Sequence, residues 1–414
     1  MNATTPTPLT TDPSTPSPHR IYIIDTLRAF ALLGILIVHT HDHFNLYIHL
    51  KPSVGWLIYA DQITDWIYQH LFVSKAYLLF SFLFGISFFI QLDRRSKKGH
   101  DFRKTFIWRL ILLIALGLIH TLFYDGDILT IFGILGMVLV AVYKLPNIII
   151  WLLTVLCLLQ PIAFWNVMIN IFSNNPDLQI PSISFHLPNV EMQTREVISQ
   201  SHSWWKVAGW NFTFGQLGKW EFFIQSCRLW QTLGMFLLGM LAGRYRIFEQ
   251  MDNVDFFKKL AIWSAGLFCF ILIVGNLPWI LQDVGISHST TQILSCWQNI
   301  AFMGVFISLI IIVFTRQKMK TPNLWMSAAG KITLTCYLSQ SIIFTPIFFN
   351  WGFGLAYEFN SFYCLSMSLV TFTIQVILCN IWLRYMLYGP IEWLWRSATL
   401  RQWQPLLNRH SRSH

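Results

Sequence analysis

Long apolar stretches recur along almost the whole chain and are separated by short polar connections. A helix that crosses a bilayer needs about 20 predominantly apolar residues, and about ten stretches meet that requirement. They lie at 21–44, 72–92, 106–123, 127–142, 148–171, 223–244, 260–281, 293–314, 332–351 and 362–387. The pattern therefore predicts an all-α, polytopic integral membrane protein with about ten transmembrane helices.

The composition agrees with a chain that lies mostly in a membrane, because 54% of its 414 residues are hydrophobic and only 12% are charged. The net charge of +10 does not indicate nucleic-acid binding, since the basic residues are scattered through short connections and form no continuous face. The 7 cysteines stand singly in or beside apolar stretches, without the spacing of a metal site or a disulfide framework. We therefore expect no nucleic-acid partner, and we interpret the cysteines as packing residues.

The connection after the second apolar stretch is strongly basic, and short cytoplasmic loops collect Lys and Arg. This connection and the start of the next stretch hold Arg94, Arg95, Lys97, Lys98, Arg103, Lys104 and Arg109. Alternating the stretches across the membrane from this point puts 22 Lys and Arg residues on the cytoplasmic side and 5 on the outer side. Both termini are therefore predicted to be cytoplasmic.

The apolar stretches form two transmembrane halves joined by one long outer connection. Residues 1–19 are rich in Thr, Pro and Ser, which predicts a disordered cytoplasmic tail and no cleavable signal peptide. Residues 20–172 form an N-terminal half of five helices, and 173–222 form an outer loop with amphipathic segments. Residues 223–398 form the C-terminal half, and 399–414 form a basic cytoplasmic tail.

Ionisable residues at the ends of apolar stretches are the candidates for chemistry, because such groups cost about 2.5–3.5 kcal/mol each inside a membrane. His120 ends the third stretch, and Asp125-Gly-Asp127 forms a tight turn before the fourth. Asp127 is predicted to cap the following helix. An imidazole beside a carboxylate can act as a general base, so His120 and Asp127 are candidate catalytic residues. The alternative is that His120 only forms a hydrogen bond to the next turn.

Two helices repeat one spacing of arginine and histidine. Arg28 precedes His39 in the first, and Arg109 precedes His120 in the third, by eleven residues. This spacing places each pair on one helix face, about 16 Å apart along the axis. The arginines would lie at a cytoplasmic mouth, where cations suit a phosphate-bearing ligand, and the histidines at an outer mouth. In the alternative interpretation, Arg28 only forms an ion pair with Asp25, and Arg109 only marks the cytoplasmic side.

Other polar positions give weaker signals. The sequence His39-Thr-His-Asp-His43 contains metal-ligand types, but alternate positions on a helix point about 200° apart. We predict no metal site, although a frayed helix end would let these side chains converge. Arg228, Tyr337 and Gln340 are further pocket candidates, whereas helix–helix hydrogen bonding accounts for the Thr and Ser residues of the ninth stretch. The sequence contains no Walker, Rossmann, zinc-protease or nucleophile-elbow motif.

Several motifs occur in a fixed order. In the N-terminal half they are Ile24-Asp-Thr-Leu-Arg-Ala-Phe-Ala-Leu-Leu-Gly-Ile-Leu36, Phe80-Ser-Phe-Leu-Phe-Gly85, Arg109 with Gly117-Leu-Ile-His120, and Gly126-Asp-Ile-Leu129. In the C-terminal half they are Leu237-Leu-Gly-Met240, Leu334-Thr-Cys-Tyr-Leu-Ser-Gln-Ser341 and Gly389-Pro-Ile-Glu-Trp-Leu-Trp-Arg396. Together they resemble the YeiB-like bacterial membrane proteins, whose C-terminal half is the domain-of-unknown-function family 418, over residues 20–398. Two positions depart from that pattern: Ala29 replaces the usual glycine after the arginine, and His39 replaces a common asparagine.

That family in turn distantly resembles transmembrane acyltransferases such as heparan-alpha-glucosaminide N-acetyltransferase. The resemblance implies a multi-pass protein of the bacterial inner membrane that moves an acyl group, such as acetyl, from cytosolic acyl-CoA to an outward-facing carbohydrate or envelope acceptor. Arg28, with Asp25 and Arg109, would bind the anionic donor. His120 would deprotonate the acceptor, Asp127 would orient the imidazole, and His39 would assist.

On this interpretation acyl-CoA is a co-substrate, and we expect no permanently bound cofactor. The expected partners are membrane lipids, acyl-CoA and the outward-facing glycan or envelope acceptor, and assembly into a homo-oligomer stays open. A second hypothesis is a transporter or exporter of a small polar solute, in which the same polar faces form a translocation path. A third, a structural membrane protein without chemistry, leaves the buried charges unexplained.

The charge distribution generates a topology prediction. Reporter fusions after Lys98 and after Ser413 are expected to read cytoplasmic, and a fusion within 185–200 is expected to read external, because Lys and Arg concentrate on the cytoplasmic side. Paired alkaline-phosphatase and fluorescent-protein fusions at each site measure this. An external reading after Lys98 would reverse the sides of the donor and acceptor mouths.

Overall fold

The computed structural model describes residues 22–44, 53–96, 101–173, 180, 190–249, 254–275, 288–314 and 320–408. Within these ranges every regular element is a helix, apart from one isolated bridge between Met386 and Leu407. The predicted all-α fold is therefore confirmed for the described part of the chain. The tail at 1–19, the segment 97–100 of the basic connection, most of 174–189 and the last six residues lie outside it.

The N-terminal half follows the predicted order of helices, with small differences at their ends. Helix α1 continues without a break into the π-helical turn η1, and α2 continues through η2 towards α3. The elements are α1 (Tyr22–Val38), η1 (His39–Phe44), α2 (Trp56–Ile67), η2 (Tyr68–Phe72), α3 (Lys75–Ser96), α4 (Arg103–Thr121) and α5 (Leu129–Val142).

The single helix predicted at 148–171 is wrong. Two helices, α6 (Asn147–Leu158) and α7 (Pro161–Phe172), meet there at 60°. Gln160 between them has a left-handed backbone, with φ 54°. Pro161 has no backbone N–H to continue the helix and disfavours a helical conformation at the residue before it, so the chain bends at this point.

The described part of the segment predicted as an outer loop contains short helices from residue 190 on: α8 (Val190–Gln200), α9 (Trp204–Trp210), η4 (Asn211–Gly215) and α10 (Gln216–Gln225). The sixth apolar stretch begins its helix at Arg228 rather than at 223, because Cys227 has a left-handed φ of 54° that separates α10 from α11. The segment 316–331, predicted as a connection, contains the helix α15 (Lys320–Lys331).

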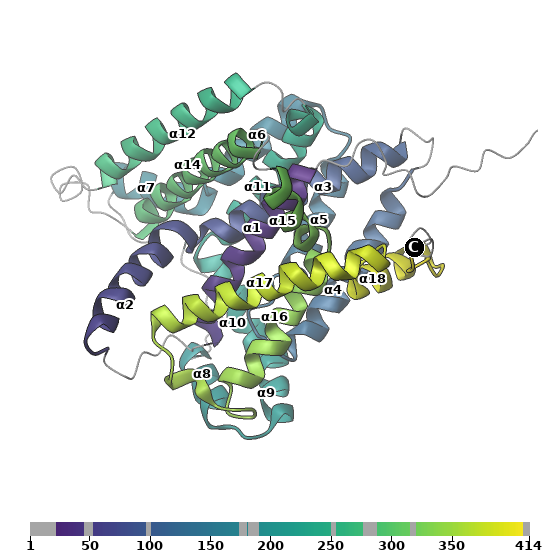
Figure 1. Cartoon of the computed structure of the whole chain (residues 1–414). Helices are drawn as coiled ribbons and strands as arrows, with labels where there is room; N and C mark the ends of the chain where they lie inside the picture. Colours follow the sequence, from purple (N-terminus) through teal and green to yellow (C-terminus); the bar gives the residue numbers. More distant parts are fainter. Residues whose placement is uncertain are drawn as a thin grey trace, which may run out of the picture.

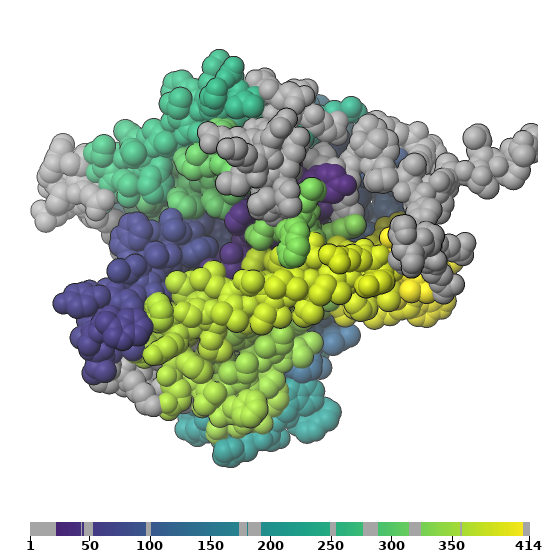
Figure 2. Space-filling model, in the orientation of Figure 1, coloured from purple at the N-terminus to yellow at the C-terminus, as the bar shows by residue number. Residues whose placement is uncertain are grey.

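The C-terminal half completes the bundle. Its elements are α11 (Arg228–Arg244), η5 (Ile247–Glu249), α12 (Val254–Gly275), α14 (His288–Phe314), α15 (Lys320–Lys331), α16 (Thr333–Phe348), η7 (Leu355–Tyr357), α17 (Ser361–Tyr385) and α18 (Pro390–Leu400). Figure 1 shows α1 inside the bundle, with α12 and α14 at one edge. In Figure 2, α17 and α18 run across one face of the molecule.

The helices support a multi-pass membrane protein. In the described ranges, 6 helices are long and apolar enough to cross a membrane, and the bent α6–α7 pair raises the number to 7. Helices α5, α11 and α16 have 14, 17 and 16 residues, shorter than a full span requires. The number of ten spans and the orientation of the termini therefore stay predictions.

Helix α1 is the centre of the packing, since 72% of its span is buried, against 11% of that of α12. Its neighbour α15 approaches so closely that a Cβ at Gly330 would lie 1.7 Å from the carbonyl oxygen of Asp25. Helices α3 and α11 approach each other in the same way: a Cβ at Gly85 would lie 2.1 Å from the Phe236 carbonyl oxygen, and one at Gly239 would lie 2.0 Å from that of Phe82. Small residues allow such close contacts between helices in membranes.

The α3–α11 contact can be tested with one methyl group. Gly85→Ala is expected to lower the free energy of unfolding by about 1–3 kcal/mol, because the added Cβ overlaps a backbone atom that cannot rotate away. Thermal unfolding in detergent measures the change. Gly266→Ala is the control, since no atom lies within 4 Å of its added Cβ on α12. Equal midpoints for the two variants would contradict the close contact.

Candidate functional site

A buried histidine–aspartate pair lies where α4 ends and α5 begins. The Nδ1 atom of His120 lies 2.9 Å from Oδ1 of Asp127, and the two residues are 2% and 0% exposed. The second oxygen, Oδ2, accepts a hydrogen bond of 3.0 Å from the backbone N–H of Thr130. An ionised carboxylate only accepts hydrogen bonds, so Nδ1 of His120 is the donor and Nε2 is the proton-accepting nitrogen. Among the described residues, this Nε2 atom has no hydrogen-bond partner.

The local sequence explains the pair. Helix α5 begins at Leu129 with Ile128 at its N-cap position, so the predicted cap lies one residue earlier than the N-cap: the Asp127 carboxylate accepts a hydrogen bond from the Thr130 amide in the first turn. Gly117 lies opposite on α4: a Cβ there would be 2.6 Å from Oδ2 of Asp127 and 2.7 Å from the Thr130 nitrogen. The glycine three residues before His120 therefore makes room for the carboxylate and the first turn of α5.

Two tyrosines contact both the His120–Asp127 pair and a second histidine, His39. The ring of Tyr337, on α16, lies 5.1 Å from that of His120 and 6.1 Å from that of His39. The ring of Tyr124 lies 6.1 Å from His120 and 4.8 Å from His39. His39 and His120 thus share the same two aromatic neighbours. We call these four residues the histidine–tyrosine cluster.

A cavity of about 460 Å³ lies between the ends of α1, α3, α4, α15 and α18. Two carboxylates, Asp25 and Glu392, and six cations line it. The cations are Arg28, Arg94, Arg95, Arg109, Lys331 and Arg396. We call it the cationic cavity.

The two arginines proposed from the sequence lie together in this cavity. Arg28 donates from Nη1 to Asp25 over 2.7 Å and from Nη2 to Ser87. The ion pair of the alternative interpretation is thus present, and the side chain is nevertheless 26% exposed and lines the cavity. The Arg109 guanidinium stacks on Trp395, 3.8 Å from the ring centre, and the Trp395 indole N–H donates to the Arg109 carbonyl over 3.0 Å.

Glu392 connects the cationic cavity to the histidine–tyrosine cluster. Its Oε1 accepts from the backbone N–H groups of Leu334 and Thr335, at 2.7 and 3.0 Å, and its Oε2 accepts from the Thr335 hydroxyl. These bonds satisfy the first turn of α16, and Tyr337 lies two residues further along that helix. Burial raises the pKa of the Glu392 carboxyl above its usual value, against the opposite effect of the hydrogen bonds.

A second cavity, of about 810 Å³, has His39 in its wall. Its wall also contains Tyr124, the α4–α5 turn and residues of α8, α10 and α11. The charged side chains in it are Asp42, Asp125, Arg195, Lys219, Glu221 and Arg228. Because Arg28 and His39 are eleven residues apart on one helix, this histidine-side cavity and the cationic cavity lie at opposite ends of α1.

The remaining pocket candidates, Arg228, Gln340 and Tyr337, lie in different parts of the structure. Arg228 lies in the wall of the histidine-side cavity, with its guanidinium 4.9 Å from the Tyr77 ring centre and 4.7 Å from that of Phe222. Gln340 lines neither of these cavities; it donates to Gln375 over 3.0 Å and joins α16 to α17. Tyr337 and His120 likewise line neither of these two cavities.

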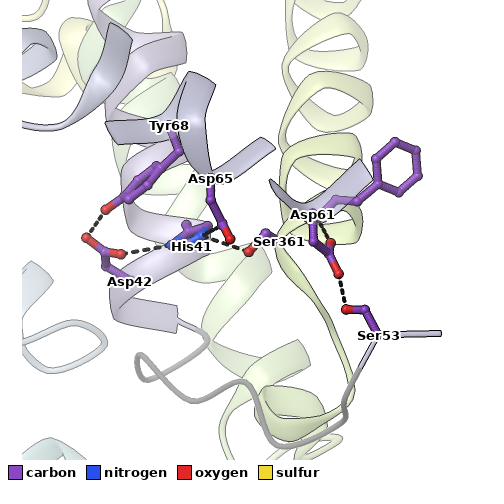
Figure 3. Close-up of polar contacts among 8 residues, drawn as sticks. His41, Asp42, Ser53, Asp61, Asp65, Tyr68 and Ser361 are labelled. Carbon is purple, nitrogen blue, oxygen red and sulfur yellow. Dashed lines mark hydrogen bonds and ion pairs between the residues drawn. The ribbon is translucent and has the colours of Figure 1, made fainter. Parts of the chain in front are cut away.

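Two histidines of the sequence His39-Thr-His-Asp-His43 have different neighbours, whereas the side chain of His43 lies outside the described part of the structure. His39 packs against aromatic rings, whereas His41 contacts Asp42 at 2.9 Å, Asp65 at 3.2 Å and Ser361 at 3.1 Å (Figure 3). His41 thereby ties η1 to α2 and α17. No group of three or more His, Cys, Asp or Glu in the described ranges could hold a metal ion.

Sequence reasoning missed several residues of the site. Arg396 and Glu392 stood inside the Gly389–Arg396 motif, which served only as a family mark. Lys331 was counted only as a cytoplasmic charge, and Lys219 only as an outer one. Their places depend on helices far apart in the sequence, so no local spacing indicates them.

Long apolar helices around a buried ionisable pair define this chain as a multi-pass membrane protein with a polar centre. Residues 242–402 match a family model described as "Protein of unknown function (DUF418)". The chain is 28% identical to "Uncharacterized protein YxaH" of Bacillus subtilis (strain 168), over 94% of this chain and 96% of that protein. It is 26% identical to "Uncharacterized protein YeiB" of Escherichia coli (strain K12), over 94% of this chain and 98% of that protein.

A third relative, "Uncharacterized 39.9 kDa protein in amylase 3'region" of Bacillus acidopullulyticus, is 25% identical over 94% of this chain and 96% of its own length. The predicted resemblance to the YeiB-like proteins and to the family 418 domain is thus confirmed. The match at 242–402 contains two of the three C-terminal motifs, 334–341 and 389–396, which the Glu392–Thr335 hydrogen bond joins; the third, 237–240, lies just before the matched residues.

Proposed function

We propose that this protein transfers an acyl group from cytosolic acyl-CoA to an outward-facing carbohydrate or envelope acceptor. It would act in the bacterial inner membrane, with ten spans and both termini in the cytoplasm. One observation supports this most: the continuous helix α1–η1 and the helix α4 each carry an arginine in the cationic cavity and a histidine of the histidine–tyrosine cluster. A site for an anionic donor and a candidate general base thus belong to the same two helices.

The cationic cavity suits the phosphates of an acyl-CoA. Six cations against two carboxylates leave an excess of positive charge in a partly enclosed space. Guanidinium groups bind phosphate oxygens in pairs, which lysine does not. Arg28 and Arg109 supply two such groups, and Trp395, which holds Arg109, adds an aromatic surface.

His120 would act as the general base. Its Nε2 takes the proton of the acceptor hydroxyl or amine, whose oxygen or nitrogen attacks the thioester carbonyl. The carbon–sulfur bond then breaks, and the CoA thiolate leaves with the proton returned by the imidazolium. Asp127, bonded to Nδ1, orients the ring and stabilises the positive charge that forms on it.

The substrates need access to Nε2, because neither cavity includes His120 in its wall. Tyr124 borders both His120 and the histidine-side cavity, so rotation of its ring would open the base to an acceptor there. His39, already in that wall, would assist by holding the acceptor.

Transport of a small polar solute is the second candidate function. The bend between α6 and α7 at Gln160 supports it, since discontinuous helices often form the binding sites of transporters. Such transporters usually contain two related discontinuous helices, whereas the described ranges contain one bent pair. Binding of acetyl-CoA by the purified protein, measured against free sugars and amino acids, separates the two hypotheses.

The donor site generates a prediction for Arg28. Arg28→Gln is expected to weaken acetyl-CoA binding about tenfold, because one charge-assisted phosphate contact contributes about 1.5–3 kcal/mol. Arg28→Lys should recover only part of the affinity, since the planar fork is lost. Calorimetry on protein in nanodiscs measures both. Lys258→Gln, an exposed change of the same charge on α12, is the control. Unchanged affinity in folded Arg28→Gln protein would leave only the ion pair with Asp25.

The base generates a prediction for His120. His120→Ala and His120→Gln are both expected to lower turnover by about 10²–10⁴-fold while leaving acetyl-CoA binding intact, because neither side chain accepts a proton near neutral pH. CoA release from acetyl-CoA with glucosamine or glucose as acceptor measures turnover. Asp127→Asn should act more mildly and shift the pH–rate profile.

A purely structural role of His120 has a different signature. Its loss would then cost about 1 kcal/mol of stability, and the amide of His120→Gln would restore most of the function. His202→Gln, at an exposed histidine between α8 and α9, is the matched control. Near-normal turnover in folded His120→Gln protein would exclude His120 as the base and favour His39 or transport.

A further inference from the structure

We propose that Lys219 is a positioning residue of the His120–Asp127 pair: its ammonium group, held by Thr130 at the wall of the histidine-side cavity, compensates the Asp127 charge and thereby sets the pH range of the imidazole. The inference rests on the proposed function for the role of His120, but it concerns a residue on a different helix, in the segment 190–225 that covers the α4–α5 turn.

A continuous set of hydrogen bonds connects Lys219 to the pair. The Lys219 Nζ atom donates to the hydroxyl of Thr130 over 2.8 Å. The backbone N–H of Thr130 donates to Asp127 Oδ2 over 3.0 Å, and Asp127 Oδ1 accepts from His120 over 2.9 Å. Lys219 is only 7% exposed, although it lines the cavity. A lysine this buried is unusual unless an opposite charge is close.

Helix α10 is held over the turn at two further points. Gln216 donates to the hydroxyl of Thr121 over 2.5 Å, at the end of α4. Gly215 lies against Asp125, where an added Cβ would be 2.8 Å from that side chain. The position of Lys219 is therefore fixed by its helix and not only by its own hydrogen bond.

The charges around the pair determine the effect of Lys219. The ionisable groups that face it or the imidazole come from α10 itself, the α4–α5 turn, α8, α11, η1 and α16. They are Glu221, Asp125, Asp127, Tyr124, Arg195, Arg228, His39, Asp42 and Tyr337. Burial lowers the pKa of Lys219 to about 8, and the nearby Asp127 and Asp125 carboxylates act in the opposite direction.

The sign of the coupling follows from these charges. With a charged Lys219, part of the Asp127 negative charge is balanced, and the imidazolium gains less from it. Removing the ammonium leaves Asp127 to favour the imidazolium, so the base stays protonated up to a higher pH. The acid limb of the pH–rate profile should therefore move upward, by roughly 1 pH unit for one nearby charge.

The test compares Lys219→Met, which removes the charge, with Lys219→Arg, which keeps it. The first readout is the NMR titration of isotope-labelled histidine in the purified full-length protein, with the His120 signal assigned by its loss in His120→Gln. The second is the pH–rate profile of CoA release with glucosamine as acceptor. Lys219→Met is expected to shift both midpoints upward, and Lys219→Arg is expected to leave them near the wild-type values.

Lys206→Met, at an exposed lysine on the neighbouring helix α9, is the matched control. Thr130→Val, which removes the hydroxyl that holds Nζ, should reproduce part of the Lys219→Met shift, and Thr130→Ser should not. A His120 titration that is the same in folded Lys219→Met and wild-type protein overturns the inference. So does a change in the acceptor KM alone, which would make Lys219 a ligand of the acceptor.

The NMR readout needs no turnover, so the two proposals fail separately. If the imidazole shifts in Lys219→Met but His120→Gln retains activity, the coupling stands and the proposed base is wrong. If His120→Gln is inactive and the imidazole does not shift, the base stands and the role of Lys219 is wrong.

Discussion

The hydrogen bond between His120 and Asp127 is the constraint on which the centre of the molecule depends. Two ionisable groups that are almost fully buried among apolar helices stabilise each other, since loss of either one would leave a desolvated polar atom of the other, Nδ1 of His120 or Oδ1 of Asp127, without this hydrogen bond. Their pairing fixes how α4 turns into α5, requires glycine at 117, and leaves Nε2 of His120 without a hydrogen-bond partner among the described residues. The cost of burying the pair is easier to understand if that nitrogen has a chemical role.

The features that could be predicted from the sequence are those in which the interacting residues are close along the chain. Apolar stretches predict most of the helices, and the short distance along the chain from His120 through Gly126 to Asp127 predicts the His120–Asp127 pair. The repeated interval of eleven residues grouped Arg28 with Arg109 and His39 with His120, because helix geometry carries a periodic pattern over that length. In the structure the two arginines line one cavity and the two histidines share aromatic neighbours.

Features that depend on tertiary contacts could not be predicted in this way. Glu392 caps a helix that begins 59 residues earlier, and Lys219 reaches a threonine 89 residues away. The bend at Gln160 had a visible cause in the following proline, but the length of the apolar stretch concealed it. Helix α15 was missed because the residues that it buries are small, from Ser327 to Gly330, and not large apolar residues at helical spacing.

The hydrogen bonds between Glu392 and the start of α16 couple the movement of α18 to that of α16. Glu392 lies on α18, three residues before Trp395 and four before Arg396, which both line the cationic cavity. A ligand that displaced α18 would pull on the first turn of α16 and would tilt Tyr337 against both imidazoles. Binding of a ligand in the cationic cavity would then move Tyr337 at the centre of the bundle, because only a few residues separate the cavity wall from the first turn of α16.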